Sequence, residues 1–208
     1  HGDAYPRALQ LSRYQGTAGK EQFTVKGRYQ VPDNLKELEI FKIAANTGHY
    51  NYTGVQVGGL EASATHYLVA GASCAQTGGI NQSSAQQNIF VTAVDKAAFV
   101  PAKTTTAYFT DYGEEDDVYV TAPHLVKVDD NRFCLLWMAD ETLYYCMLDS
   151  AGQRISDVFC ADAALSDCKP IVVNGCVTWY VTDWSDDWSA EMHVYRIPLT
   201  ADAAHSPV

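Results

Sequence analysis

The sequence predicts an all-β fold, and three observations support that class. Short runs rich in Val, Tyr, Thr and Leu, which suit a half-buried pleated surface, recur along the 208 residues. Helix signals are confined to one short segment. The strand-like runs also repeat as groups of four. With 47% apolar residues, a chain of this length can bury a sizeable core, so a disordered state is excluded.

The strand-like runs are separated by turn residues such as Gly, Asn and Asp. In chain order, they are residues 8–14, 22–31, 53–60, 66–73, 87–95, 124–130, 132–138, 142–149, 170–175, 176–183 and 192–199. The helix candidate is PDNLKELEIFKIA, residues 32–44, where Asn34 is placed to cap a helix and apolar residues follow at helical spacing. A strand over residues 38–44 is an equal alternative.

The runs repeat with the spacing of a propeller blade. Residues 126–153 read as a strand, a tight turn, an apolar strand, a hairpin and a fourth strand closing at Asp149, and residues 172–199 follow the same plan. Phe133 and Val177 are 44 residues apart, the length of a four-stranded blade. Tyr67 and Phe133 are 66 residues apart, so PAKTTTAYFTDYGEEDD, residues 101–117, is expected to be an insertion.

These observations predict one β-propeller-like domain over residues 1–208, with three to four four-stranded blades. We expect a partial blade and a connection in 1–50, a blade with the insertion in 51–120, and further blades in 121–165 and 166–208. A closed ring needs at least four blades. The chain is therefore expected to be part of a propeller, completed by flanking blades or by a partner. An ordinary β-sandwich is the alternative fold.

The charge balance argues against nucleic acid as a partner. The chain has 14 Lys and Arg against 25 Asp and Glu, which gives a net charge of −11. A surface of that sign repels phosphate backbones. Since no apolar run reaches about 18 residues, we expect no membrane insertion.

Six cysteines occur at positions 74, 134, 146, 160, 168 and 176, without a CxxC pair or zinc-type spacing. Cys134 and Cys146 are each six residues from Asp140, the tip of a predicted hairpin, so a disulfide between them is one interpretation. Cys168 and Cys176 also flank a turn and are a second candidate pair. Free thiols are slightly favoured, because several of these residues lie in apolar runs.

The segment WYVTDWSDDWSAEMHVYRI, residues 179–197, is the first candidate site. Its predicted hairpin connection, 182–190, carries Trp184, Asp186, Asp187 and Trp188. Exposed Trp rings stack on the apolar faces of sugars, and neighbouring carboxylates accept hydrogen bonds from hydroxyls, so the segment suits a ligand-binding platform. The favoured alternative is that both rings pack in the core or fold back over the edge of a blade.

The acidic run DYGEEDDVYV is a second candidate, for a metal. Carboxylate oxygens are the ligands that Ca²⁺ prefers, and the candidates are Glu114, Glu115, Asp116 and Asp117. A solvated, self-repelling loop is the favoured alternative. No other cofactor is expected.

Several segments resemble a family of propeller-type repeats in large exported proteins of Firmicutes, in particular clostridia. The segments are HGDAYPR, YTGVQVGGLEAS, HYLVAGAS, TAPHLVKVDDNRFCLLW and LSDCKPIVVNGCVTWYVTD, and the resemblance spans most of residues 1–198. It implies a propeller-type fold and an extracellular or cell-surface location. It implies no catalytic residues.

The leading functional hypothesis is a non-catalytic binding or adhesion module that recognises a glycan or a surface protein. Motifs for a nucleophile elbow, a zinc protease, a P-loop and a dinucleotide fold are all absent from the sequence, so catalytic residues stay unassigned. One alternative is a carbohydrate-active hydrolase that uses loop carboxylates. Another is a structural unit without a small-molecule ligand, in which the interface with a second copy or with flanking blades closes the ring.

Overall fold

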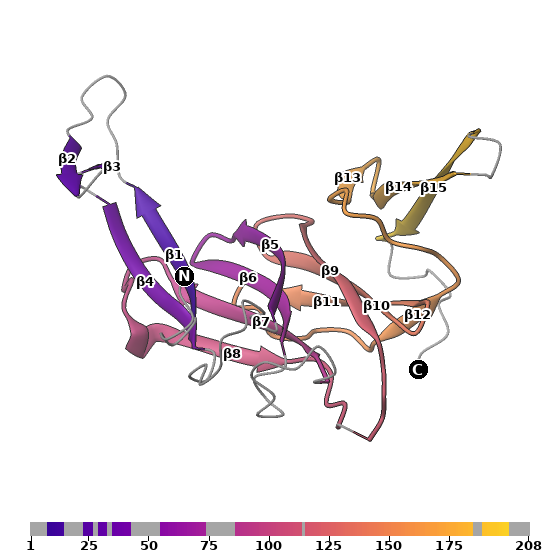
Figure 1. Cartoon of the computed structure of the whole chain (residues 1–208), viewed down its shortest axis with the longest axis horizontal. Coiled ribbons are helices and arrows are strands. Elements are labelled where there is room, and N and C mark those ends of the chain that lie inside the picture. Colours follow the sequence, from indigo (N-terminus) through magenta and orange to yellow (C-terminus); the bar gives the residue numbers. More distant parts are fainter. Residues whose placement is uncertain are drawn as a thin grey trace.

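The computed structural model describes residues 8–14, 23–26, 29–32, 35–42, 55–73, 86–113, 115–184 and 189–199. These residues form strands and one short 3-10 turn, η1 (Pro101–Lys103), and none of their helices is long and apolar enough to cross a membrane (Figure 1). The strands are β1 (Ala8–Tyr14), β2 (Phe23–Lys26), β3 (Tyr29–Pro32), β4 (Leu35–Lys42), β5 (Val55–Ala62), β6 (His66–Ser73), β7 (Asn88–Asp95), β8 (Thr104–Tyr108), β9 (Val120–Lys127), β10 (Arg132–Ala139), β11 (Thr142–Asp149), β12 (Phe159–Ala161), β13 (Ile171–Val173), β14 (Cys176–Trp184) and β15 (Ala190–Pro198).

The prediction of an all-β fold is confirmed, and every strand pairing is antiparallel. Strands β5 to β8 form one four-stranded sheet in chain order, and β9 to β12 form a second. Strands β13 to β15 form a three-stranded sheet, and β1/β4 and β2/β3 form two-stranded ribbons. Each of the three larger sheets is thus a meander of consecutive strands.

Apart from the β2/β3 ribbon, the sheets follow one another in chain order (Figure 1). They pack face to face, with an apolar core at each junction. The β1/β4 ribbon covers one face of the β5–β8 sheet, where Phe41 stacks on Phe90 with ring centroids 4.1 Å apart. The other face of the β5–β8 sheet packs on the β9–β12 sheet around the fully buried Phe133 and Trp137. The β13–β15 sheet packs its own apolar side chains, including Trp179, on the far face of the β9–β12 sheet.

This stacking explains the apolar pattern of the strands. Strands β6, β7 and β10 lie inside sheets that are covered on both faces, so their residues are buried almost without interruption. A strand buried on both faces reads as a continuous apolar run. In β14, by contrast, Val177 and Trp179 are buried whereas Tyr180 is exposed, because one face of its sheet is uncovered. The alternation of buried and exposed residues in β14 therefore reflects the position of its sheet at the end of the stack.

Two hairpins use tight turns that require left-handed backbone. Asp140 and Glu141 join β10 to β11 with φ values of 46° and 66°, and Asn174 and Gly175 join β13 to β14 with 50° and 74°. Positive φ at both central residues is the type I′ pattern, whose twist matches that of the flanking strands. Asn-Gly is the preferred pair for this turn. Asp140 gains a further contact, since its Oδ1 accepts a hydrogen bond of 2.8 Å from the Tyr119 N–H.

Three sequence-based expectations need correction. For residues 32–44 the helix candidate is wrong and the equal alternative of a strand is confirmed: the segment contains β4, which pairs with β1 and buries Leu38 and Phe41. The predicted insertion at 101–117 contains β8, a Thr-rich edge strand that completes the β5–β8 sheet. The fourth strand of the next sheet is β12 at Phe159–Ala161, beyond the predicted end at Asp149.

The favoured expectation of free thiols is confirmed for the described cysteines, and the alternative of a disulfide across the β10–β11 hairpin is wrong. Cys134 lies opposite Met147, and Cys146 lies opposite Leu135, so the two thiols point to opposite faces of the sheet. Each packs in a different core. The cysteines of the described residues, at 134, 146, 160, 168 and 176, are all free. Burial raises the pKa of the Cys146 thiol to about 12 and also raises the pKa of Cys134.

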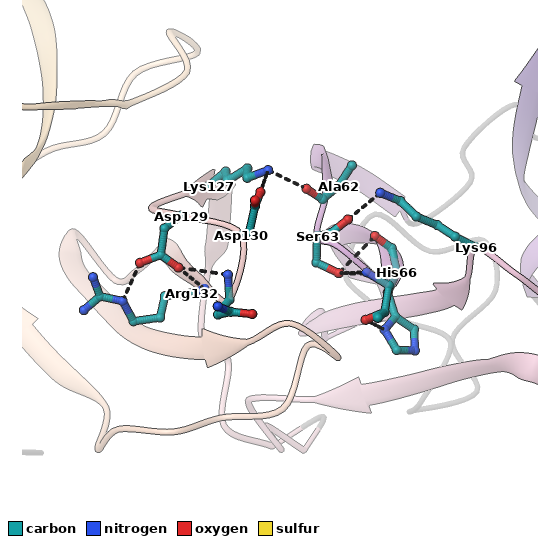
Figure 2. Close-up of polar contacts among 10 residues, drawn as sticks. Ala62, Ser63, His66, Lys96, Lys127, Asp129, Asp130 and Arg132 are labelled. Atoms are coloured by element: carbon teal, nitrogen blue, oxygen red, sulfur yellow. Dashed lines mark hydrogen bonds and ion pairs between the residues drawn. The ribbon is translucent and has the colours of Figure 1, made fainter.

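Two lysines fasten the β5–β6 turn to the neighbouring strands (Figure 2). Lys127 of β9 donates a hydrogen bond of 2.9 Å to the Ala62 carbonyl and pairs with Asp130 at 2.6 Å. Lys96, which follows β7, donates to the Ser63 carbonyl. These ammonium groups satisfy turn carbonyls where the two four-stranded sheets meet, so we assign the cluster a structural role.

Candidate functional site

A cavity of about 310 Å³ lies where the β5–β8 and β9–β12 sheets meet. Its walls come from the segment after β8, from the facing strands β10 and β11, and from the connection between β11 and β12. The lining residues are Phe109, Thr110, Tyr112, Trp137, Tyr144, Arg154, Asp157 and Val158. A concave site with aromatic walls and a few polar groups is the usual form of a small-ligand site.

The buried amide of Asn88 fixes one wall of the cavity. Its Nδ2 donates to the Tyr112 carbonyl at 3.0 Å, and its Oδ1 accepts from the Tyr112 N–H at 2.7 Å. The same Oδ1 accepts from the Thr110 hydroxyl at 2.8 Å, which in turn accepts from the Ile89 N–H at 2.9 Å. Asn88 is fully buried. The segment that carries Phe109, Thr110 and Tyr112 is therefore held on the first strand positions of β7.

Gln86 holds the other end of the same loop. Its Nε2 donates to the Val118 carbonyl at 2.7 Å, and its Oε1 accepts from the Val118 N–H at 3.1 Å. Gln86 and Asn88 are alternate residues of one extended segment, so both amides point to the same side. Together they clamp the two ends of the acidic loop beside the cavity.

Trp137 and Tyr144 form the aromatic part of the cavity. They are directly opposite in the β10–β11 register, and their rings stack with centroids 5.8 Å apart and an interplanar angle of 15°. Trp137 is 1% exposed, and its indole N–H has no hydrogen-bond partner among the described residues. An unpaired buried donor costs about 1–3 kcal/mol, so native proteins rarely keep one without a reason. The unpaired donor is the indole N–H of Trp137, and Trp137 is one of the residues that line the cavity.

Charged groups of opposite sign complete the cavity. Arg154 and Asp157 are exposed residues of the β11–β12 connection, and both contribute to the lining. Desolvation raises the pKa of the Tyr112 phenol, with smaller contributions from Tyr144, Asp140 and Asp116. Tyr112 is therefore neutral at physiological pH and can both donate and accept. The cavity thus offers cationic, anionic and neutral hydrogen-bonding groups beside aromatic rings.

The predicted tryptophan platform is described in part. Strand β14 runs to Trp184 and β15 resumes at Ala190, so the connection is residues 185–189 and is shorter than the predicted 182–190. Trp184 is 69% exposed, whereas Trp179 is buried and donates from Nε1 to the Ala164 carbonyl at 2.7 Å. Asp186, Asp187 and Trp188 lie outside the described residues. The platform stays a prediction, and Trp184 belongs to a different sheet from the cavity.

The acidic run is likewise described in part, since Glu114 lies outside the described residues. Asp116 accepts a hydrogen bond of 2.7 Å from the Gly113 N–H through Oδ2, which closes a turn. Glu115 and Asp117 are exposed. Across the part of the chain that the structure describes, no three His, Cys, Asp or Glu residues are grouped to hold a metal ion. The calcium site stays a prediction without support from these residues.

The sequence alone did not identify the cavity residues as a site. The sequence predicts strands over Trp137 and Tyr144, and Arg154 and Asp157 lie in a connection with no motif. The hairpin places residues 137 and 144 opposite each other only when its turn is centred between Asp140 and Glu141. Comparison of the chain with protein-family models, with curated protein sequences and with solved structures found no match.

Proposed function

We propose that this chain is a non-catalytic carbohydrate-binding module of an exported bacterial protein. The observation that carries the proposal is the cavity lined by Tyr112, Trp137 and Tyr144 with Arg154 and Asp157. Aromatic rings stack on the apolar faces of pyranoses, while charged and neutral polar groups hydrogen-bond to the hydroxyls. At about 310 Å³ the cavity is at the small end of ligand sites, which suits a terminal sugar unit of a glycan.

A partial β-propeller is the architecture that we propose for the scaffold. Three consecutive meanders, stacked face to face in chain order, support it. Stacked blades hide their faces against one another and leave short edges. In this arrangement the cavity lies between two neighbouring blades, on connections held by a rigid framework, where binding residues commonly lie. The export of the protein rests on the resemblance of its repeats alone.

The number of carboxylates that line the cavity favours binding over hydrolysis. Asp157 is the single carboxylate among the described residues that line the cavity. Glycoside hydrolysis generally uses two carboxyl groups on opposite sides of the bond that is cleaved. The described lining therefore supplies one half of that arrangement. The charges and rings instead suit recognition without bond cleavage.

A glycan-panel screen with the purified chain tests the proposal, with calcium and again with EDTA, and with reducing-sugar release measured in parallel. For the glycan that binds, we expect Tyr144→Ala to abolish binding, because it removes the stacking surface. Trp137→Phe keeps the buried ring and deletes only the unpaired N–H. We expect it to weaken binding by roughly tenfold, equivalent to about 1.4 kcal/mol, if the ligand accepts from that group.

Trp184→Ala is the matched control, because it removes an aromatic ring from another sheet. Binding that survives Tyr144→Ala and is lost in Trp184→Ala would move the site to the β14–β15 hairpin. Sugar release that stops in Asp157→Asn would replace the binding module by a hydrolase. Circular dichroism of each variant shows whether the fold is intact, so that loss of binding is not confused with unfolding.

A further inference from the structure

The outer face of the β13–β15 sheet is an apolar surface. Strand residues alternate between faces, so the residues that point away from the core formed by Val177 and Trp179 belong together. They include large side chains with exposed fractions of 41–69% in strands that are otherwise well ordered into a sheet. The residues are Ile171, Val173, Tyr180, Trp184, Met192 and Val194.

Continuity with the rest of the stack indicates that another sheet covers this face. The β5–β8 and β9–β12 sheets are each packed on both faces, through the three apolar cores. One side of the β13–β15 sheet meets protein through Val177, Trp179 and Ile197. The other side has no partner among the described strands, and its Tyr180 hydroxyl accepts a hydrogen bond of 3.2 Å from Cys168 of the preceding connection (Figure 1). Exposed apolar patches of this kind mark interaction sites.

The charges of the chain also avoid this face. The protein has 25 acidic residues and a net charge of −11. The acidic residues within β13, β14 and β15 are Asp183 and Glu191, which lie opposite each other in the register and on the same face as Trp179, so neither projects from the outer face. The described charge on the outer face is Arg196, opposite Thr178. Depletion of charge at the centre is typical of the core of an interface.

We propose that this face binds the same face of a second copy of the chain, about a two-fold axis. The inference goes beyond carbohydrate binding and does not depend on it. Sheets that pack face to face align within about 30° and interdigitate side chains, as the sheets of this chain already do. A two-fold contact uses one patch twice, so a largely apolar face is complementary to itself.

The positions of Trp184 and Arg196 favour this two-fold arrangement. Trp184 lies at one end of the β14–β15 hairpin, and the Thr178–Arg196 pair lies near the other end. A two-fold axis in the interface, perpendicular to the strands, brings Trp184 of one copy against Arg196 of the second copy. A guanidinium over an indole ring is a favourable cation–π pair. The symmetry forms this contact twice, once at each end.

A head-to-tail contact is disfavoured by the opposite end of the stack. The outward residues of the β1/β4 ribbon are polar, and they include Gln10, Ser12, Glu37 and Glu39, all exposed. An apolar face that packed on these residues would bury carboxylates without partners, which is costly. The second copy therefore uses its own β13–β15 face.

Sedimentation equilibrium of the full chain tests the proposal, because it gives the mass in solution over a range of concentrations. We expect twice the chain mass for the wild type. Val194→Asp places a carboxylate near the centre of the face, and we expect it to weaken dimerisation at least tenfold. Val57→Asp is the matched control. Val57 lies on β5 and is 61% exposed, so this substitution adds the same negative charge away from the β13–β15 face. We expect it to stay dimeric.

A charge-pair experiment separates a face-to-face contact from any other. Val194→Asp and Val194→Lys should each be monomeric, and an equimolar mixture of the two should regain the dimer mass. A monomeric wild type at all concentrations would overturn the proposal. So would a dimer that persists in Val194→Asp, since the contact would then lie elsewhere, such as the open edge of β15. Glycan binding by the monomeric variants is measured in a separate experiment, and its result does not affect the conclusion on dimerisation.

Discussion

The imidazole of His124 donates a hydrogen bond of 2.8 Å from Nε2 to the carbonyl oxygen of Ser166. A carbonyl oxygen only accepts, so Nε2 carries the proton in the neutral ring. The Ser166 hydroxyl donates in turn to the Tyr180 carbonyl at 2.8 Å. His124 belongs to β9 and Tyr180 to β14. The two bonds therefore fasten the connection between β12 and β13 to the sheets on both sides of it.

The first prediction concerns pH. Burial lowers the pKa of His124, with a further contribution from Lys169, against opposite effects of the Ser166 hydrogen bond and Asp167. Between the lowered pKa and the unfolded value of about 6.5, the unfolded chain binds a proton that the folded chain does not. This contribution to stability is therefore complete above about pH 6.5 and is lost as the pH falls below that value.

We expect the urea midpoint of the wild type to fall between about pH 7.5 and pH 5 by more than that of His124→Gln. The glutamine retains a donor for the Ser166 carbonyl and has no group that titrates in this range. The carboxylates common to both proteins contribute the same pH dependence, so the difference between the two curves isolates His124. If the urea midpoints of the two proteins changed with pH in parallel, the His124 ring would have no influence on stability between about pH 5 and pH 7.5.

The second prediction concerns the amide clamp beside the cavity. Asn88→Ala removes the partner of the Tyr112 N–H and carbonyl and of the Thr110 hydroxyl. We expect it to lower the free energy of unfolding by about 2–4 kcal/mol, because buried polar groups lose their partners. Thr105→Ala, an exposed change in β8, serves as control and should stay within about 0.5 kcal/mol of the wild type. Chemical denaturation measures both. An equally small change in the free energy of unfolding for Asn88→Ala would mean that the loop keeps its conformation without the Asn88 amide.

Much of the strand content could be predicted from the sequence because the local signals agree with the final structure. Strands β6 and β11 coincide with the predicted runs 66–73 and 142–149. In both, β-branched, aromatic and leucine side chains fit a pleated surface, and turn residues stand at the ends. The sequence does not reveal strand β8, because the repeat length makes Thr104 to Thr106 part of an expected insertion. A polar edge strand has no apolar alternation to reveal it.

The cavity could not be predicted because it depends on register to a single residue. Placing the hairpin tip at Asp140 makes Cys134 and Cys146 opposite each other, whereas the turn is centred between Asp140 and Glu141. A shift of one residue reverses the face of every side chain. The correct centre pairs Trp137 with Tyr144 instead. The rest of the lining comes from connections that only the packing of two sheets brings together.

The third prediction follows from the opposite orientation of Cys134 and Cys146. Both thiols are buried and their pKa values are raised, so neither forms the reactive thiolate at neutral pH. We expect a thiol reagent to modify Cys168, which is exposed, in the native protein, and to leave Cys134 and Cys146 unmodified until urea is added. Mass spectrometry of the labelled peptides gives the positions. A disulfide-linked peptide that contains both residues would contradict the described register.

The fourth prediction concerns the close approach of β5 to β9. A Cβ atom at Gly58 would overlap the carbonyl group and the Cβ of Pro123. The two strands can approach this closely only because Gly58 has no side chain. Gly58→Ala must push the main chain of β9 away from the β5–β8 sheet. We expect a loss of about 1–3 kcal/mol, as for overpacking in a well-packed core. This loss would exceed the small gain that Ala gives by restricting the unfolded chain.

Gly113→Ala provides the matched control for this prediction. Its added Cβ would meet only the Asp116 carboxylate, at an ordinary 3.7 Å, and its backbone does not need positive φ. We expect its unfolding midpoint to stay within the range of neutral surface substitutions, about 0.5 kcal/mol. Thermal or urea denaturation of the pair separates steric conflict from a general effect of replacing glycine. Equal stability of the two variants would mean that β5 and β9 are farther apart in solution than the structure has them.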